Sequence, residues 1–73
     1  MNETQDMAEL VVRLRQRLKL TQEQLAARLG VTCPTVNRWE NRKSRPSKLA
    51  LKLIKSTLEQ LGAEDLLTQY FPH

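Results

Sequence analysis

The feature that most constrains this chain is the segment LTQEQLAARLGVTCPTVNRW, residues 20–39, in which a single glycine separates two helical patterns. Thr21 and Gln24 have the spacing of a capping box, so a helix is expected to begin directly after Thr21. Gly30 is expected to end that helix, because glycine adopts the left-handed backbone conformation without the steric cost of a Cβ. The segment therefore predicts two short helices that meet at a sharp turn.

The second of these helices is expected over residues 33–41, and either Thr32 or Cys33 can serve as its N-cap. Thr32 is preferred because it carries a capping hydroxyl. Cys33 is the alternative because it precedes a proline, and a residue before proline is disfavoured in the helical region and can therefore stand just outside the helix. Val36 and Trp39 share one side of this helix and are expected to be buried. The opposite side is polar, and it carries Asn37, Arg38, Asn41 and Arg42.

The rest of the chain also predicts helices. Apolar residues recur at three- and four-residue spacing over residues 7–18, with Asp6 as the N-cap. Another helix is expected to follow the cap Ser47 and to end at Gly62, and a short final helix is expected over residues 63–70. The predicted fold class is therefore all-α, with four to five helices. The helix after Ser47 is expected to pack on two sides, because its apolar residues surround it widely; they are Leu49, Leu51, Leu53, Ile54, Leu58 and Leu61.

The expected organisation is one small domain with two short ends. Residues 1–6 are expected to form a flexible acidic N-terminus, residues 7–61 the helical domain, and residues 62–73 a short C-terminal helix and tail. A domain of this size has a barely sufficient apolar core. The last two helical segments carry more apolar residues than such a core needs, so they are the expected contact for a second copy of the chain.

Basic residues are concentrated in the middle of the chain. The 73 residues include 12 Lys and Arg, and all of these lie between Arg13 and Lys55, where only Glu23 and Glu40 oppose them. The remaining acidic residues lie toward the two ends. A basic segment of this kind attracts polyanions, and nucleic acid is therefore an expected partner.

The residue types disfavour several classes of function. The chain has one cysteine, Cys33, and one histidine, His73, so neither an intrachain disulfide nor a metal site is expected. No serine or cysteine nucleophile is accompanied by a histidine in a defined motif, so neither enzymatic activity nor a cofactor is expected. The apolar runs are too short for a signal peptide or a membrane span, which favours a cytoplasmic location.

Two helices joined by a short turn with glycine, the second helix polar on its outer side, form the pattern of a helix-turn-helix. The run TQEQLAARLGVTCPTVNRWENRKSRPS resembles the helix-turn-helix family of phage Cro and repressor proteins, also called the XRE family. The resemblance extends over about residues 12–54. It implies a compact domain of the phage-repressor type that acts as a sequence-specific transcriptional regulator, commonly a repressor, with the second helix in the DNA major groove.

The resemblance also implies roles for polar residues around the second helix. The residues that it places at base edges are Cys33, Pro34, Asn37 and Arg38. The residues that it places at DNA phosphates are Gln22, Thr35, Asn41, Arg42, Lys43 and Arg45. Family members often have Gln, Arg or Ser where Cys33 and Pro34 stand, so these two residues are expected to make apolar contacts, for example with a thymine methyl group.

Three further residues stand at positions with a structural meaning in the family. Arg15 and Glu40 match an arginine and a glutamate that form a partly buried ion pair in similar phage repressors, and we expect that pair here. Arg42 stands where many members have glycine. Either the helix continues through Arg42, or Arg42 adopts a strained backbone conformation.

The partners that follow from this reading are double-stranded DNA and a second copy of the chain. A two-fold dimer would bind a pseudo-palindrome whose half-sites lie one helical turn apart. The alternative is an antitoxin or another protein-interaction module of the same fold, which would hold a protein partner such as a toxin. No membrane partner is expected.

Overall fold

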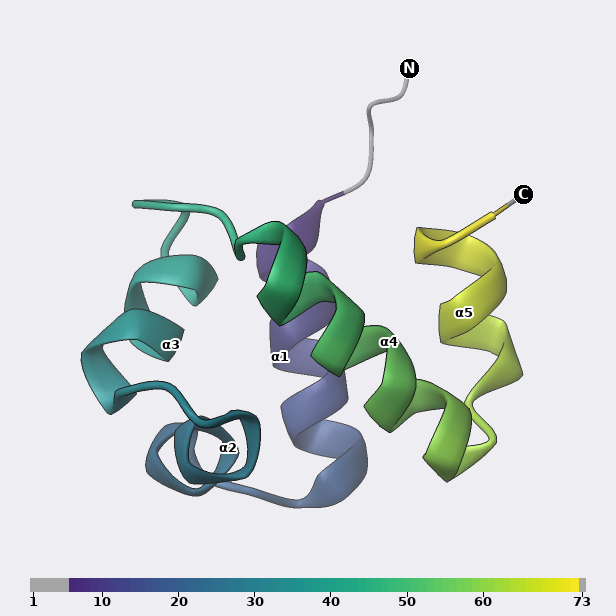
Figure 1. The fold of residues 1–73 in the computed structure, drawn as a ribbon, viewed down its shortest axis with the longest axis horizontal. Helices are drawn as coiled ribbons and strands as arrows, with labels where there is room; N and C mark the ends of the chain where they lie inside the picture. Colours follow the sequence, from purple (N-terminus) through teal and green to yellow (C-terminus); the bar gives the residue numbers. More distant parts are fainter. Residues whose placement is uncertain (1–5, 73) are drawn as a thin grey trace.

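The computed structural model describes residues 6–72, and every regular element in that range is a helix. The helices are α1 (Met7–Leu18), α2 (Gln22–Leu29), α3 (Cys33–Glu40), α4 (Lys48–Leu61) and α5 (Glu64–Tyr70). The predicted all-α fold class is therefore confirmed. Of the expected flexible segment 1–6, only Asp6 lies within the described residues. Figure 1 shows α4 crossing α1, with α2 and α3 on one side of this pair and α5 on the other.

The ends of the helices follow the capping residues. The Thr21 side chain accepts a hydrogen bond from the backbone N–H of Gln24, and the Gln24 side chain accepts one from the backbone N–H of Thr21, which completes the capping box. Gly30 ends α2 with a φ of 74°. Thr32, not Cys33, caps α3, because its hydroxyl accepts from the backbone N–H of Thr35 at 3.4 Å.

One core connects all five helices. The fully buried large side chains come from α1, α2, α3, α4 and α5 in turn, and they are Leu10, Val11, Leu14, Leu25, Val36, Ile54, Leu58 and Leu66. Trp39 is only 4% exposed and belongs to the same core. The two residues expected on the inner side of α3, Val36 and Trp39, are thus both buried, and they fix which side of α3 faces outward.

Polar contacts hold α5 against α1. The Arg13 guanidinium donates to the Gln69 amide oxygen at 2.9 Å and lies 3.4 Å from the Tyr70 hydroxyl, which itself donates to Glu9. Arg17 forms an ion pair with Asp65. Acidic and polar groups of the C-terminal helix are therefore used against basic residues of α1, which reduces the positive charge that α1 presents to a partner.

The expected two-sided packing of α4 is not present within the single chain. Ala50, Ile54 and Leu58 point into the core, whereas Leu49, Leu53 and Leu61 are 68%, 41% and 41% exposed. Among the described elements, α5 and α2 pack against α4, and they leave these three leucines partly or largely exposed. Leu49 and Leu53 lie one turn apart on the outer side of α4, and Leu61 is the last residue of the helix. These three exposed leucines are called the α4 leucine surface below.

Candidate nucleic-acid interface

The turn between α2 and α3 presents α3 at the edge of the molecule. After Gly30, the backbone N–H of Val31 donates back to the carbonyl of Ala26 at 2.9 Å, which closes the end of α2. The chain then enters α3 through the Thr32 cap, and α2 and α3 pack directly on one another. Because Val36 and Trp39 anchor one side of α3 in the core, its other side lies open at the edge of the fold, as Figure 1 shows.

The four residues expected at base edges differ in exposure. Pro34, Asn37 and Arg38 are exposed, whereas Cys33 is only partly exposed and packs against the core with its free thiol. The Arg38 guanidinium makes no hydrogen bond or ion pair with residues 6–72, so all of its donors are available to a ligand. Arg38 is therefore the best-placed cation on the outer side of α3.

An ion pair between Arg15 of α1 and Glu40 of α3 lies behind this outer side, as expected. Arg15 Nε lies 2.8 Å from Glu40 Oε2, and Arg15 Nη2 lies 3.1 Å from Glu40 Oε1, so the contact is bidentate. The Glu40 side chain is only 8% exposed. Burial by itself would raise the pKa of Glu40. The hydrogen bonds from Arg15 and Gln22 and the charge of Arg15 outweigh this effect, so the pKa of Glu40 lies below its ordinary value.

A row of hydrogen bonds continues from this ion pair to the outer side of α3. Gln22 Nε2 donates to Glu40 Oε1 at 2.9 Å, and Asn37 Nδ2 donates to Gln22 Oε1 at 3.2 Å. The row thus connects an expected phosphate-contacting residue, Gln22, with an expected base-contacting residue, Asn37. Arg15, Glu40, Gln22 and Asn37 are called the amide relay below.

Other expected phosphate-contacting side chains are also bonded within the protein. The Thr35 hydroxyl lies 2.8 Å from the Thr32 hydroxyl at the start of α3. The Asn41 amide donates to the Asn37 carbonyl at 2.9 Å, close to the end of α3. These contacts position both side chains at the two ends of α3, and each retains further hydrogen-bonding capacity for a phosphate oxygen.

Arg42 takes the strained alternative. α3 ends at Glu40 with Asn41 as its C-cap, one residue earlier than expected, and Arg42 then has a φ of 60°. The left-handed conformation costs an L-residue roughly 1–2 kcal/mol. It allows the backbone N–H of Lys43 to donate to the Arg38 carbonyl at 2.9 Å, which satisfies an otherwise unpaired carbonyl at the end of α3.

The side chain of Arg42 forms an ion pair with Asp6, which the sequence reasoning did not anticipate. Asp6 also caps α1 by accepting from the backbone N–H of Glu9 at 3.1 Å. This backbone hydrogen bond, and after it the contact with Arg42, lowers the pKa of Asp6 in spite of its partial desolvation. A half-buried carboxylate therefore competes with any phosphate for Arg42. No short sequence spacing indicates a contact between residues so far apart in the chain.

Lys43 and Arg45 have no such competitor among the described residues. Both side chains are exposed, and neither forms an ion pair with residues 6–72. Together with Arg42 they line a surface groove between the start of α1 and the loop that follows α3. This loop therefore presents available positive charge next to α3.

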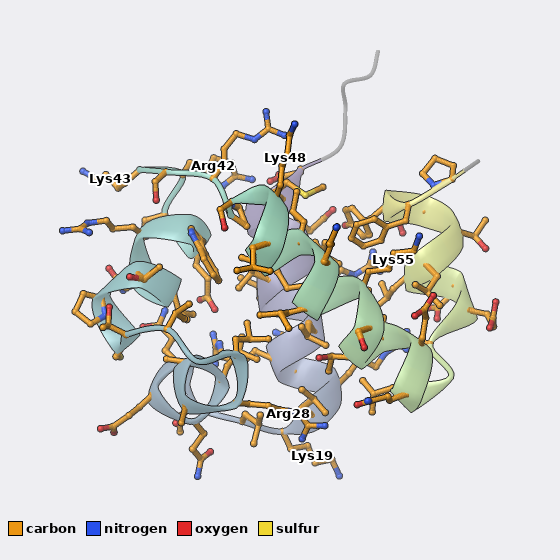
Figure 2. The ribbon with its side chains drawn as sticks, viewed as in Figure 1. Lys19, Arg28, Arg42, Lys43, Lys48 and Lys55 are labelled. Carbon is orange, nitrogen blue, oxygen red and sulfur yellow. The ribbon has the colours of Figure 1, made fainter. Side chains whose placement is uncertain are left out.

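The basic residues do not form one continuous patch. Figure 2 shows Arg42, Lys43 and Lys48 around the loop after α3, whereas Lys19 and Arg28 lie at the opposite edge of the view and Lys55 lies toward α5. Lys55 places its ammonium group 5.9 Å from the centre of the Phe71 ring, which is a cation–π distance. The basic residues that can act on a ligand at α3 are thus those near this helix, which include Arg42, Lys43 and Lys48.

Two further kinds of site are not found in the described part of the chain. Among residues 6–72, no three His, Cys, Asp or Glu side chains gather in a way that would hold a metal ion. No described helix is long and apolar enough to cross a membrane.

Comparison with known proteins gives one match. A protein-family model described as helix-turn-helix matches residues 11–62, a range that extends from α1 through Gly62 and includes the whole amide relay. Neither the search of curated proteins nor the search of solved structures found a match.

Proposed function

Because the chain belongs to the helix-turn-helix family of Cro-type and phage-repressor proteins, the XRE family, we propose that it represses transcription by binding specific DNA sequences. Membership makes it a DNA-binding regulator of the XRE type. Sequence specificity and repression go beyond membership. We propose repression because a domain that occupies promoter DNA excludes other proteins from that DNA.

The observation that carries sequence specificity is the outer side of α3. Asn37 and Arg38 are exposed there, while Val36 and Trp39 hold the opposite side in the core. A helix with polar side chains on one side fits the major groove, which is about 12 Å wide and displays a distinct donor and acceptor pattern for each base pair. Arg38 has its donors free, and a guanidinium pairs with O6 and N7 of guanine.

Phosphate contacts would position α3 in the groove. The proposed contacts come from the start of α2, from both ends of α3 and from the loop after α3, and they are Gln22, Thr35, Asn41, Arg42, Lys43 and Arg45. Lys43 and Arg45 support this role best, because they are exposed and unpaired among the described residues. Such contacts fix orientation and contribute affinity without reading sequence.

The α4 leucine surface supports a homodimer on DNA. Leu49, Leu53 and Leu61 are large apolar side chains that would be covered by a second copy of the chain. A dimer of this kind would place two α3 helices about 34–36 Å apart on a pseudo-palindromic site. The same surface favours a second candidate function, an antitoxin that covers these leucines with a toxin of unrelated sequence.

The test is selection from a random double-stranded DNA pool at about physiological salt, followed by sequencing of the bound fraction. Enrichment of paired half-sites one helical turn apart is expected. Retention of DNA without enrichment would refute sequence specificity, because it would leave only electrostatic binding. Enrichment of single half-sites, with a monomer in sedimentation experiments with and without DNA, would refute the homodimer and direct attention to a different protein partner.

A further inference from the structure

The amide relay gives Asn37 one defined orientation. The Glu40 carboxylate can only accept hydrogen bonds when ionised, so Gln22 must present its amide nitrogen, Nε2, to Glu40. Gln22 Oε1 is then the atom left for Asn37, and an oxygen can only accept. Asn37 must therefore present Nδ2 to Gln22, as it does at 3.2 Å. The direction of the whole row follows from the carboxylate at its inner end.

The inner end of the relay is itself fixed. Glu40 accepts from Arg15 through both of its oxygens, at 2.8 and 3.1 Å, and its side chain is only 8% exposed. The pKa of Glu40 is lowered, so the carboxylate is ionised at neutral pH and remains an acceptor. Rotation of the Gln22 amide by a half-turn would place two oxygens against each other, and this arrangement is unfavourable in a partly buried site.

This orientation determines which atoms of Asn37 are left for a ligand. One N–H of Nδ2 is used by Gln22, so Oδ1 and the second N–H of Nδ2 remain. An acceptor beside a donor complements adenine, which offers the N6 amino group as donor and N7 as acceptor in the major groove. Guanine offers two acceptors, O6 and N7, and Oδ1 would face one of them with no proton to share between the two acceptor atoms.

We propose that Asn37 reads an adenine in the operator and that Gln22 and Glu40 act as positioning residues that enforce adenine over guanine. The proposal rests on the proposed function, because it requires α3 to lie in the major groove. It also separates Asn37 from its neighbour Arg38, whose guanidinium offers only donors and therefore complements guanine.

The test begins with the operator selected by the wild-type protein. Each position of a half-site is then replaced in turn, and the Kd ratio for guanine against adenine is measured for wild type and for Asn37→Ala. At one position the wild type is expected to prefer adenine by about 5- to 150-fold, the range for one bidentate pair, and Asn37→Ala is expected to lose this preference. A ratio is used because phosphate contacts affect both duplexes alike.

Two variants then test the relay at that position. Glu40→Gln allows the Gln22 amide to take either orientation, and Gln22→Met removes the connection while the Arg15–Glu40 ion pair remains. Both are expected to reduce the adenine preference below the lower limit of about fivefold. The matched control is Glu23→Gln, which removes the same charge from an exposed position of α2. It is expected to strengthen binding to both duplexes alike and to leave the ratio unchanged.

Each outcome decides one proposal. Adenine preference that survives Asn37→Ala at every position would overturn the assignment of Asn37. Preference that depends on Asn37 but is unchanged in Glu40→Gln and Gln22→Met would overturn the relay. Failure of the wild type to enrich any sequence would refute the proposed function itself, and this inference with it. Circular dichroism establishes that each variant is folded, and Gln22→Met serves alone if Glu40→Gln is not.

Discussion

Replacement of Arg42 by glycine and, separately, by alanine is expected to measure the strain in the turn after α3. Arg42 has a φ of 60°, a conformation that costs an L-residue about 1–2 kcal/mol. Both replacements remove the guanidinium and its ion pair with Asp6, so that contribution cancels between them. Glycine loses about 0.5–1 kcal/mol more backbone entropy than alanine on folding. The glycine variant is therefore expected to be more stable than the alanine variant by about 0.75 kcal/mol, the difference between the middle values of the two ranges.

The assay is urea denaturation followed by helical circular dichroism. With an m-value of about 1–2 kcal/mol per M, typical of a small domain, the two midpoints are expected to differ by about 0.4–0.8 M. The control is the same pair of replacements at Lys43, which has no positive φ. There the alanine variant is expected to be at least as stable as the glycine variant. If replacing alanine by glycine has the same effect on stability at position 42 as at position 43, the strain at Arg42 is refuted.

Arg42 is also one of the residues proposed to contact a DNA phosphate, so its replacement is expected to affect DNA binding. Arg42→Gly is expected to bind operator DNA more weakly than wild type even where it is more stable, because a cation beside α3 is lost. The slope of log K against log salt is expected to become shallower by about 0.9, the value for one phosphate contact on duplex DNA. An unchanged slope would refute a phosphate contact by Arg42, the result expected if the ion pair with Asp6 persists on DNA.

Three further outcomes are expected. Trp39→Ala should cost about 3–5 kcal/mol of unfolding free energy, a large share of the stability of a small domain, and a fully folded variant at 37 °C would contradict its place in the core. Lys43→Ala should weaken binding to every duplex alike and reduce the salt slope by about 0.9, and a loss confined to one sequence would instead indicate base contact. The pKa of Glu40 is lower in the folded state than its ordinary value of 4.5, so the stability that ionised Glu40 contributes is complete above pH 4.5. This stability is lost as the pH falls through the folded-state pKa. The urea midpoint should therefore fall less between pH 6 and pH 3 in Glu40→Gln than in wild type.

The helix ends could be predicted because capping is local. Thr21 with Gln24, Ser47, and the two glycines Gly30 and Gly62 each act within a few residues of the end that they determine, so their signals are complete in the sequence. The burial of Val36 and Trp39 could also be predicted, because the helical period alone places both side chains on the same side of the helix. The Arg15–Glu40 pair came from the family resemblance, not from spacing.

The contacts that could not be predicted join residues from different helices. The Asp6–Arg42 ion pair depends on how α1 meets the loop after α3, and no local pattern carries that distance. The hydrogen bond from Asn37 to Gln22 depends on the crossing of α2 and α3. The family resemblance predicts a phosphate contact for Gln22 and a base contact for Asn37, with no link between the two residues. In the folded protein a hydrogen bond already joins them in the absence of DNA.

Because Asn37 is hydrogen-bonded to Gln22, the two exposed polar residues of α3, Asn37 and Arg38, differ in how far their replacement is expected to affect the stability of the fold. The Arg38 side chain is exposed and its guanidinium forms no hydrogen bond or ion pair with residues 6–72, so a replacement there is expected to change what the helix presents to DNA and to leave the fold intact. Asn37 is the outer end of a row that begins at the buried Glu40, and Glu40 also joins α1 to α3 through Arg15. The same carboxylate thus joins two helices and orients the proposed adenine contact. Replacement of Glu40 is therefore expected to change stability and base preference together, whereas replacement of Arg38 is expected to change base preference alone.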